Sequence, residues 1–301
     1  MKRFVFHTGV ELLRLAEKYK MPISKIALNY EQGISEKTEK EVIAKMKRNL
    51  DVMREAVKSG LRLNKKSFSG MSGGNASKMF KYAESRSKKI VSKTLLKAMS
   101  YAIACGETNA QMGRIVAFPT AGASGVIPAA VLSVAEELKL SDEKIMKGLF
   151  TASAIGLIIA ENATLAGAYG GCQAEIGSAS AMAAAAITEM RGGTPKQCLD
   201  AAALSLKNML GLTCDPIAGL VEVPCVKRNA MGVTNAFSGS EIALAGIESF
   251  VTFDDVVEAM KTTGEMMPSA LRETALGGLA LTKTGCRIRA KIGLPPIKNT
   301  R

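Results

Sequence analysis

The sequence predicts an all-α protein. Aromatic residues make up only 5% of the chain and Trp is absent, whereas strands favour aromatic and β-branched side chains. Hydrophobic residues make up 47% of the 301 residues, enough to bury a large core. Apolar residues recur at intervals of three and four, and no convincing alternation of apolar and polar residues indicates a strand. We therefore expect residues 1–301 to form a single helical domain.

The first 60 residues are expected to form a basic helical segment whose helices have one polar face. Their apolar positions recur at helical spacing: Leu12, Leu13 and Ala16, and later Val42, Ile43, Met46 and Leu50. A Ser- and Gly-rich segment follows at residues 64–75. It is either a linker or a ligand loop, and its composition favours a linker.

From about residue 92 onward, apolar helices alternate with glycine-rich turns. Capping residues predict where three of these helices begin. Ser141 and Thr252 each stand before acidic residues, which stabilise the first turn of a helix. Thr194 precedes Pro195 and opens a capping box with Gln197.

The positive charge is concentrated in the first third of the chain. Residues 1–100 hold 23 Lys and Arg against 9 Asp and Glu, a balance of +14, while residues 101–301 hold 17 against 18, a balance of −1. This surplus is consistent with a nucleic-acid patch or with a surface for an acidic partner. We favour a third interpretation, an ordinary solvated helix face.

No segment has the pattern of a signal peptide. The basic residues after Met1 are followed by a short mixed run without a small-residue cleavage site. The most apolar stretch, residues 148–160, is shorter than the roughly 20 residues of a membrane span. We expect a soluble, cytoplasmic protein without a membrane partner.

Three of the six cysteines stand in glycine- or proline-containing turns. Cys172 follows two glycines and precedes an Ala-rich helix, while Cys214 and Cys225 each lie close to a proline. The absence of CxxC pairs argues against a zinc ribbon, and a disulfide framework is not expected without an export signal. A single buried cysteine is usually a small hydrophobe, but three in such turns favour a metal or cluster site.

A further glycine-rich turn precedes a helix expected over about residues 125–139. Its sequence, PTAGASG at residues 119–125, combines small residues with hydroxyl groups. Backbone N–H groups at such a turn can bind an anion such as a carboxylate, although a plain tight turn has the same composition.

Three segments closely resemble the signature segments of the α-chain of bacterial iron–sulfur L-serine dehydratases. They are PTAGASGVIPA, GGCQAEIGSASAMAAA and LGLTCDPIAGLVEVPCVKRNAMG, and the spacing of their cysteines matches as well. Residues 270–274 resemble the C-terminal segment of the family. The resemblance covers essentially the whole chain and is strongest over about residues 105–285.

The resemblance implies a helical fold with glycine-rich loops around a [4Fe–4S] cluster bound by Cys172, Cys214 and Cys225. It places the cluster and catalytic core in residues 92–285. The implied activity is that of an L-serine ammonia-lyase, which deaminates L-serine to pyruvate and ammonia without PLP. The open iron of the cluster acts as a Lewis acid on the serine hydroxyl. Amino-acid degradation and gluconeogenesis are the implied processes.

The expected substrate site is the 120–125 turn. Its residues are Thr120, Gly122, Ala123, Ser124 and Gly125, with the two hydroxyl groups donating hydrogen bonds to the substrate carboxylate. Catalytic roles are assigned to Thr120, Ser124, Lys227 and Asn229. Lys227 and Arg228 are equally consistent with surface charges.

The resemblance also implies a separate β-subunit, because single-chain family members carry a β-portion at the N-terminus and this chain leaves no room for one. His7, the only histidine, is a poor candidate for the base that removes the α-proton, and a histidine of the β-portion is expected to serve instead. Cys105, Cys198 and Cys286 lie outside the matching segments, and Cys198 is interpreted as a packing residue.

Three other functions compete with this interpretation. A nucleic-acid-binding protein would use the basic first third but leaves the cysteine turns unexplained, and aromatic residues are not interleaved with the charges. An electron-transfer iron–sulfur protein normally has four cysteines for each cluster. A PLP-dependent dehydratase would need a Schiff-base lysine, for which no sequence context stands out.

Overall fold

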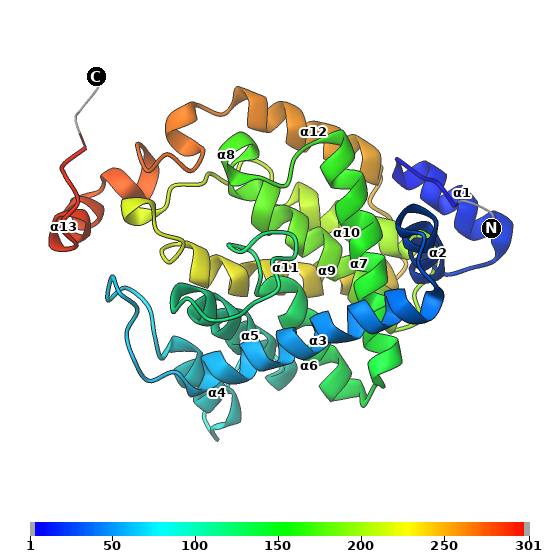
Figure 1. Cartoon of the computed structure of the whole chain (residues 1–301), viewed down its shortest axis with the longest axis horizontal. Helices are drawn as coiled ribbons and strands as arrows, with labels where there is room; N and C mark the ends of the chain where they lie inside the picture. Colours follow the sequence, from blue (N-terminus) through cyan, green and yellow to red (C-terminus); the bar gives the residue numbers. More distant parts are fainter. Residues whose placement is uncertain (1–3, 298–301) are drawn as a thin grey trace.

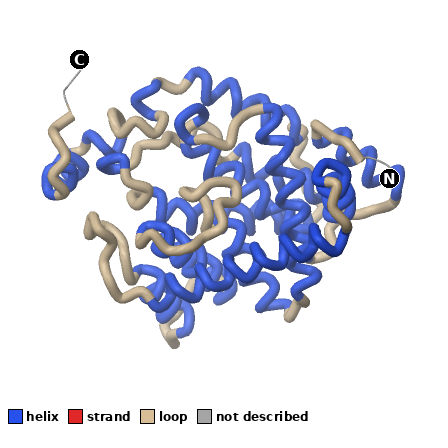
Figure 2. Tube along the Cα trace, viewed as in Figure 1, coloured by secondary structure: helices blue, strands red, loops and turns tan. Residues whose placement is uncertain are grey.

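A computed structural model describes residues 4–297, and these residues are helical with connecting loops (Figures 1 and 2). The helices are α1 (Gly9–Tyr19), α2 (Ile23–Ser35), α3 (Glu39–Arg62), α4 (Asn75–Glu84), α5 (Lys93–Ala110), α6 (Val126–Leu138), α7 (Asp142–Asn162), α8 (Gly167–Gly170), α9 (Ser178–Met190), α10 (Pro195–Lys207), α11 (Cys225–Leu244), α12 (Phe253–Met266) and α13 (Lys283–Lys291). Four short turns are η1 (Gln173–Gly177), η2 (Ile217–Gly219), η3 (Ser269–Leu271) and η4 (Gly278–Leu281). No strand occurs between residues 4 and 297, so the all-α prediction is confirmed.

The helix starts predicted from capping residues are confirmed. Ser141 caps α7 and accepts a hydrogen bond from the N–H of Lys144, and Thr252 caps α12 in the same way. Thr194 and Gln197 form the expected capping box at the start of α10. The helix expected over about residues 125–139 is α6. These signals are local, which is why the sequence alone locates them.

The N-terminal helices bury the apolar positions found in the sequence. Leu12 and Ala16 of α1, and Val42 and Leu50 of α3, are all buried. α2 packs against α7, and α3 crosses α5 (Figure 1). At this crossing Gly60 allows the two backbones to meet, because a Cβ at this position would lie 2.1 Å from the carbonyl oxygen of Ala104.

α9 is the centre of the fold. Nearly all its residues are buried, and it contacts α6, α7, α10 and α11 on different sides. Its sequence, SASAMAAAAITEM, supplies mostly small side chains, so four helices can approach it closely. The hydrophobic core around α9 extends from Phe6 to Met260 and includes residues of the N-terminal helices. This arrangement places the loops before α6, α9 and α11 beside one another.

α7 is the one helix, within the described residues, that is long and apolar enough to cross a membrane. Its most apolar window is 61% buried within the fold, where the helix packs against α9 and α2. Such burial is typical of a helix in the core of a globular fold.

Seven Lys and Arg side chains of residues 4–100 take part in ion pairs. Asp142 at the start of α7 pairs with both Lys47 and Arg54, and these hydrogen bonds hold the pKa of its carboxyl well below the usual range. Lys25 pairs with Glu39 at 2.8 Å between α2 and α3. These contacts agree with the interpretation of this charge as a solvated helix face.

Candidate functional site

The three cysteines of the expected ligand set lie in loops that lead into α9, η2 and α11. Cys172 directly precedes η1, Cys214 lies in the loop after α10, and Cys225 is the first residue of α11. All three are buried, with exposed fractions of 2%, 3% and 7%. Burial raises the pKa of the Cys214 thiol, and the nearby Cys172 and Cys225 raise it further, so the structure brings near one another three residues that are distant in the sequence.

Gln173 fixes the position of the Cys172 loop. Its backbone N–H donates to the carbonyl oxygen of Leu212 at 3.0 Å, and its fully buried side chain donates to a carbonyl of α12 at 2.9 Å. Gly171 permits this approach: its φ of 72° is left-handed, and a Cβ there would lie 2.9 Å from the Leu212 oxygen. The loop is therefore tied to the segment that leads to Cys214.

A C-terminal segment pairs with Cys214. The Cys214 N–H donates to the carbonyl oxygen of Leu271 at 2.8 Å, and the Glu273 N–H donates to the Cys214 oxygen at 2.7 Å. Arg272 lies between these two contacts. Residues 270–274 were recognised only by their resemblance to the family, because a contact over almost 60 positions leaves no periodic signal in the sequence. The structure places this segment at the site.

Arg228 is a cation of the cysteine site. Its guanidinium donates to the Thr213 carbonyl oxygen at 2.7 Å and to Asp215 Oδ1 at 3.0 Å. Burial lowers the pKa of Arg228, but the negative charges of Cys172 and Asp215 outweigh this effect and raise the pKa overall. Arg228 is therefore not a surface charge, and it can offset the charge of a nearby thiolate.

Asn229 joins the 120–125 turn to α11. Its Oδ1 accepts from the Gly125 N–H at 2.8 Å, while its Nδ2 donates to the carbonyl oxygens of Gly122 at 2.7 Å and Cys225 at 2.9 Å. Asn229 is buried, so the structure gives it a positioning role between the turn and the cysteine. Lys227, by contrast, is exposed and has no ion pair within residues 4–297.

The hydroxyl groups of the turn already have partners inside the protein. Thr120 Oγ1 donates to Glu175 Oε1 at 2.7 Å and accepts from the N–H of the buried Ala123 at 3.3 Å. Ser124 Oγ donates to the Ala121 carbonyl oxygen at 2.7 Å. Among the described hydrogen bonds, none uses the N–H of Thr120, Ala121 or Gly122. These three backbone groups of the turn can donate to an anionic ligand.

Glu175 is a site residue that the sequence analysis missed. It lies between the two glycine-rich segments: a Cβ added at Gly122 would be 3.2 Å from its Oε1, and one at Gly167 would be 2.7 Å from its Oε2. Burial raises the pKa of its carboxyl, the hydrogen bond from Thr120 lowers it, and the nearby Glu273 raises it further. The available signal was that Glu175, three residues after Cys172, is the only charged residue between Glu161 and Glu189.

The Ser- and Gly-rich segment at residues 64–75 is not a linker. The hydroxyl groups of Ser67, Ser69 and Ser72 all donate to the carboxylate of Glu222, with the Ser69 bond at 2.8 Å. All four residues are buried. We call these three hydrogen bonds the Glu222 clasp. Because Glu222 lies three positions before Cys225, the clasp attaches the 64–75 loop to the cysteine loop.

Replacing Glu222 with Ala should lower the free energy of unfolding by about 2–3 kcal/mol, because buried hydroxyl groups lose their acceptor. Urea unfolding followed by far-UV circular dichroism measures the change. Glu265→Ala is the control, because Glu265 is exposed in α12, and it should cost less than about 0.5 kcal/mol. Equal stabilities of the two variants would show that the clasp does not stabilise the fold.

The other cysteines and the histidine lie outside the site. Cys198 in α10 and Cys105 in α5 are buried in the helical core, and Cys286 in α13 is exposed. All six cysteines lie between residues 4 and 297, and each is a free thiol there. His7 is exposed, and its Nδ1 lies 2.9 Å from Oε2 of Glu161.

A comparison with protein families decides the relationship. The family model described as "Serine dehydratase alpha chain" matches residues 18–280 of the sequence. This range includes every residue assigned above to the cysteine site. The chain belongs to the serine dehydratase α-chain family.

Curated relatives agree with this assignment. The probable L-serine dehydratase alpha chain of Bacillus subtilis (strain 168) is 49% identical over 288 residues, which cover 96% of this chain and 95% of the relative. The L-serine dehydratase alpha chain of Peptoniphilus asaccharolyticus is 47% identical over 285 residues, which cover 95% of this chain and 97% of the relative. The L-serine dehydratase of Streptomyces coelicolor is 38% identical over 293 residues, which cover 94% of this chain but only 62% of the relative.

The donor set of this serine dehydratase α-chain fits an iron–sulfur cluster. Burial raises the pKa of Cys172 to about 11 and that of Cys225 to about 12, and Arg228 opposes both shifts. Thiols in such surroundings become thiolates when a positively charged metal group binds them. Between residues 4 and 297, no three His, Cys, Asp or Glu side chains converge on a single metal ion. In an iron–sulfur cluster each cysteine binds a different iron, so the thiols of a cluster site do not converge on one point as the ligands of a single ion do.

Proposed function

We propose that the chain is the cluster-carrying α-chain of an L-serine dehydratase, an ammonia-lyase that converts L-serine to pyruvate and ammonia. The observation that carries this proposal is the meeting of three buried cysteine loops within the part of the chain that matches the family. The relatives from B. subtilis and P. asaccharolyticus, named as L-serine dehydratase alpha chains, support the same substrate and reaction.

In this proposal Cys172, Cys214 and Cys225 hold a [4Fe–4S] cluster, and PLP takes no part. When bound, the cluster would supply an iron without a cysteine ligand, which can polarise the serine hydroxyl as a Lewis acid. Arg228, which is hydrogen-bonded to Asp215, offsets part of the thiolate charge. The thiol donors, their burial and this cation are the features that support the assignment.

The reaction removes the α-proton and the hydroxyl group of serine. The resulting aminoacrylate tautomerises to an imine, which hydrolyses to pyruvate and ammonia. The N–H groups of Ala121 and Gly122 can bind the substrate carboxylate, and Asn229 holds their turn in place. Glu175 can hold a proton on Oε2 while Oε1 accepts from Thr120, and such a proton can accompany the departing hydroxyl.

A β-subunit completes the proposed enzyme. The family and the relatives from B. subtilis and P. asaccharolyticus are described as alpha chains, a designation that supports a partner subunit. His7 pairs with Glu161 rather than with a residue of the cysteine site, which supports a base from the partner. We place the enzyme in the cytoplasm, in amino-acid degradation that feeds gluconeogenesis.

The test is anaerobic purification of the enzyme followed by iron and acid-labile sulfide analysis and an assay of pyruvate formation. We expect both elements, activity with L-serine without added PLP, loss of nearly all activity in air, and recovery with ferrous iron and a thiol reductant. An iron without a cysteine ligand is the most readily oxidised part of such a cluster. Activity that survives prolonged aeration, or that requires PLP, would contradict the proposal.

A further inference from the structure

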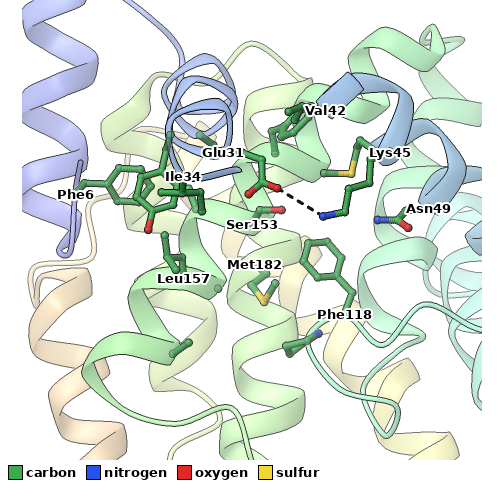
Figure 3. A pocket seen from close by; sticks show the side chains of 18 of the residues that line it. Phe6, Glu31, Ile34, Val42, Lys45, Asn49, Phe118, Ser153, Leu157 and Met182 are labelled. Carbon is green, nitrogen blue, oxygen red and sulfur yellow. Dashed lines mark ion pairs between the residues drawn. The ribbon is translucent and has the colours of Figure 1, made fainter. Parts of the chain in front are cut away.

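A cavity that is open to solvent on one side, separate from the cysteine loops, lies between α2, α3 and α7. Its volume is about 410 Å³, within the range of small-molecule sites. Most of its wall is apolar. Figure 3 shows Phe118, Met182, Leu157 and Ile34 around it. A cavity of this size and lining suits a small ligand with an apolar body.

Two opposite charges lie together at the solvent side of this cavity. Glu31 of α2 and Lys45 of α3 approach to 3.6 Å, with side chains that are 32% and 57% exposed (Figure 3). A pair so exposed and so long is weak, so a ligand that carries both charges can open it at little cost. Asn49 lies beside Lys45 and its side-chain amide has no hydrogen bond within the described residues. It offers a further donor to a carboxylate.

Two segments that contact Glu175 also line the cavity. Phe118 and Pro119 line the cavity and lead directly to Thr120, whose hydroxyl donates to Glu175 Oε1 at 2.7 Å. Leu165 also lines it and is two residues from Gly167, which lies against Glu175 Oε2. An occupant would therefore contact both segments that position the cysteine site.

We propose that this cavity is a binding site for an apolar α-amino acid, separate from the site for serine. Glu31 receives the ammonium group, Lys45 and Asn49 receive the carboxylate, and the side chain lies among Phe118 and Met182. Charge-assisted hydrogen bonds at both ends of the ligand fix its orientation. Aromatic and thioether side chains favour an aromatic ring in the apolar part. L-Phenylalanine is the probe that this chemistry selects.

Isothermal titration calorimetry of the complete chain with L-phenylalanine tests the proposal, because it needs neither a cluster nor turnover of serine. We expect saturable binding to one site. 3-Phenylpropanoate lacks the ammonium group and 2-phenylethylamine lacks the carboxylate, and each should bind about tenfold more weakly or worse. L-Serine should bind this cavity more weakly than L-phenylalanine, since its side chain buries little apolar area.

Variants of the charged pair connect the binding to this cavity. Glu31→Gln and Lys45→Met should each weaken L-phenylalanine binding about tenfold or more. The matched controls are Lys25→Met and Glu39→Gln, which break an ion pair between the same two helices outside the cavity and should leave binding unchanged.

Three results would overturn the proposal: no saturable binding of L-phenylalanine, analogues that bind as well as the amino acid, or an affinity that Glu31→Gln and Lys45→Met leave unchanged. The comparison of analogues uses the unaltered chain, so it remains decisive if a variant fails to fold.

Discussion

Replacing any one of Cys172, Cys214 and Cys225 with Ser should remove the cluster absorbance and lower the dehydratase activity more than about 100-fold. Loss of an outer partner of a metal ligand already costs 10- to 100-fold, so the loss of a ligand should cost more. The three thiols are buried together, and a serine hydroxyl is a poor ligand for iron in such a cluster. The visible absorption spectrum and pyruvate formation, both measured anaerobically, report the two effects.

Cys198→Ser is the matched control. Cys198 is fully buried in α10, and it packs in the helical core rather than in the cysteine loops. The substitution should cost some stability, because it buries a hydroxyl group, yet it should leave the cluster spectrum and the activity nearly intact. A cluster that survives Cys225→Ser but is lost in Cys198→Ser would show that the ligand assignment is wrong.

The sequence located helices and cysteine loops because their signals are local. Ser141, Thr194 and Thr252 bind N–H groups only three residues away, so the cap and its partner appear in the same short segment. The cysteine turns were recognised by their glycines and prolines, and then by resemblance to a family. Neither source says which segments meet in space, and the meeting of the three loops comes from the packing of α9 and α11.

The contacts that the sequence did not reveal join residues far apart in the chain. Ser67 and Glu222 are 155 positions apart, and a serine-rich loop has the composition of a linker whether or not a buried carboxylate binds it. Cys214 and Glu273 pair through backbone atoms, which carry no side-chain signature. The sequence left open whether Arg228 is a surface charge or a site residue. Its burial beside Asp215 decides between the two, and only the structure shows that contact.

The same structure offers a surface where the proposed β-subunit can bind. Exposed apolar side chains stand in segments that contact the loops of the cysteine site, and exposed apolar residues that gather in this way are typical of interfaces. We call them the apolar rim: Phe68, Tyr169, Val221, Leu276 and Leu279. Phe68 stands between two serines of the Glu222 clasp and is 93% exposed, and Leu279 donates its N–H to Asp215. A partner on this rim would cover the cysteine site and could present a base to it.

The α-chain alone should therefore bind a cluster but turn over serine at least about 100-fold more slowly than the reconstituted pair. A positioned base usually contributes a factor of this size, and pyruvate formation with and without the β-subunit measures it.

Phe68→Ser should weaken association with the β-subunit by about 30-fold, the effect of losing one aromatic hot spot worth about 2 kcal/mol. Phe250→Ser is the matched control, because Phe250 is 99% exposed in the loop before α12, outside the rim. Analytical ultracentrifugation and surface plasmon resonance measure the association.

The basic first third offers a competing location for the interface, and salt dependence distinguishes the two. Lys37, Lys40 and Lys88 are exposed, so reversing their charges would slow association with an acidic partner face and reduce its dependence on salt. Binding centred on the apolar rim should instead respond to Phe68→Ser and only weakly to these reversals. Equal affinity of the Phe68→Ser and Phe250→Ser variants would exclude the rim, and full activity of the α-chain alone would remove the need for a base from a partner.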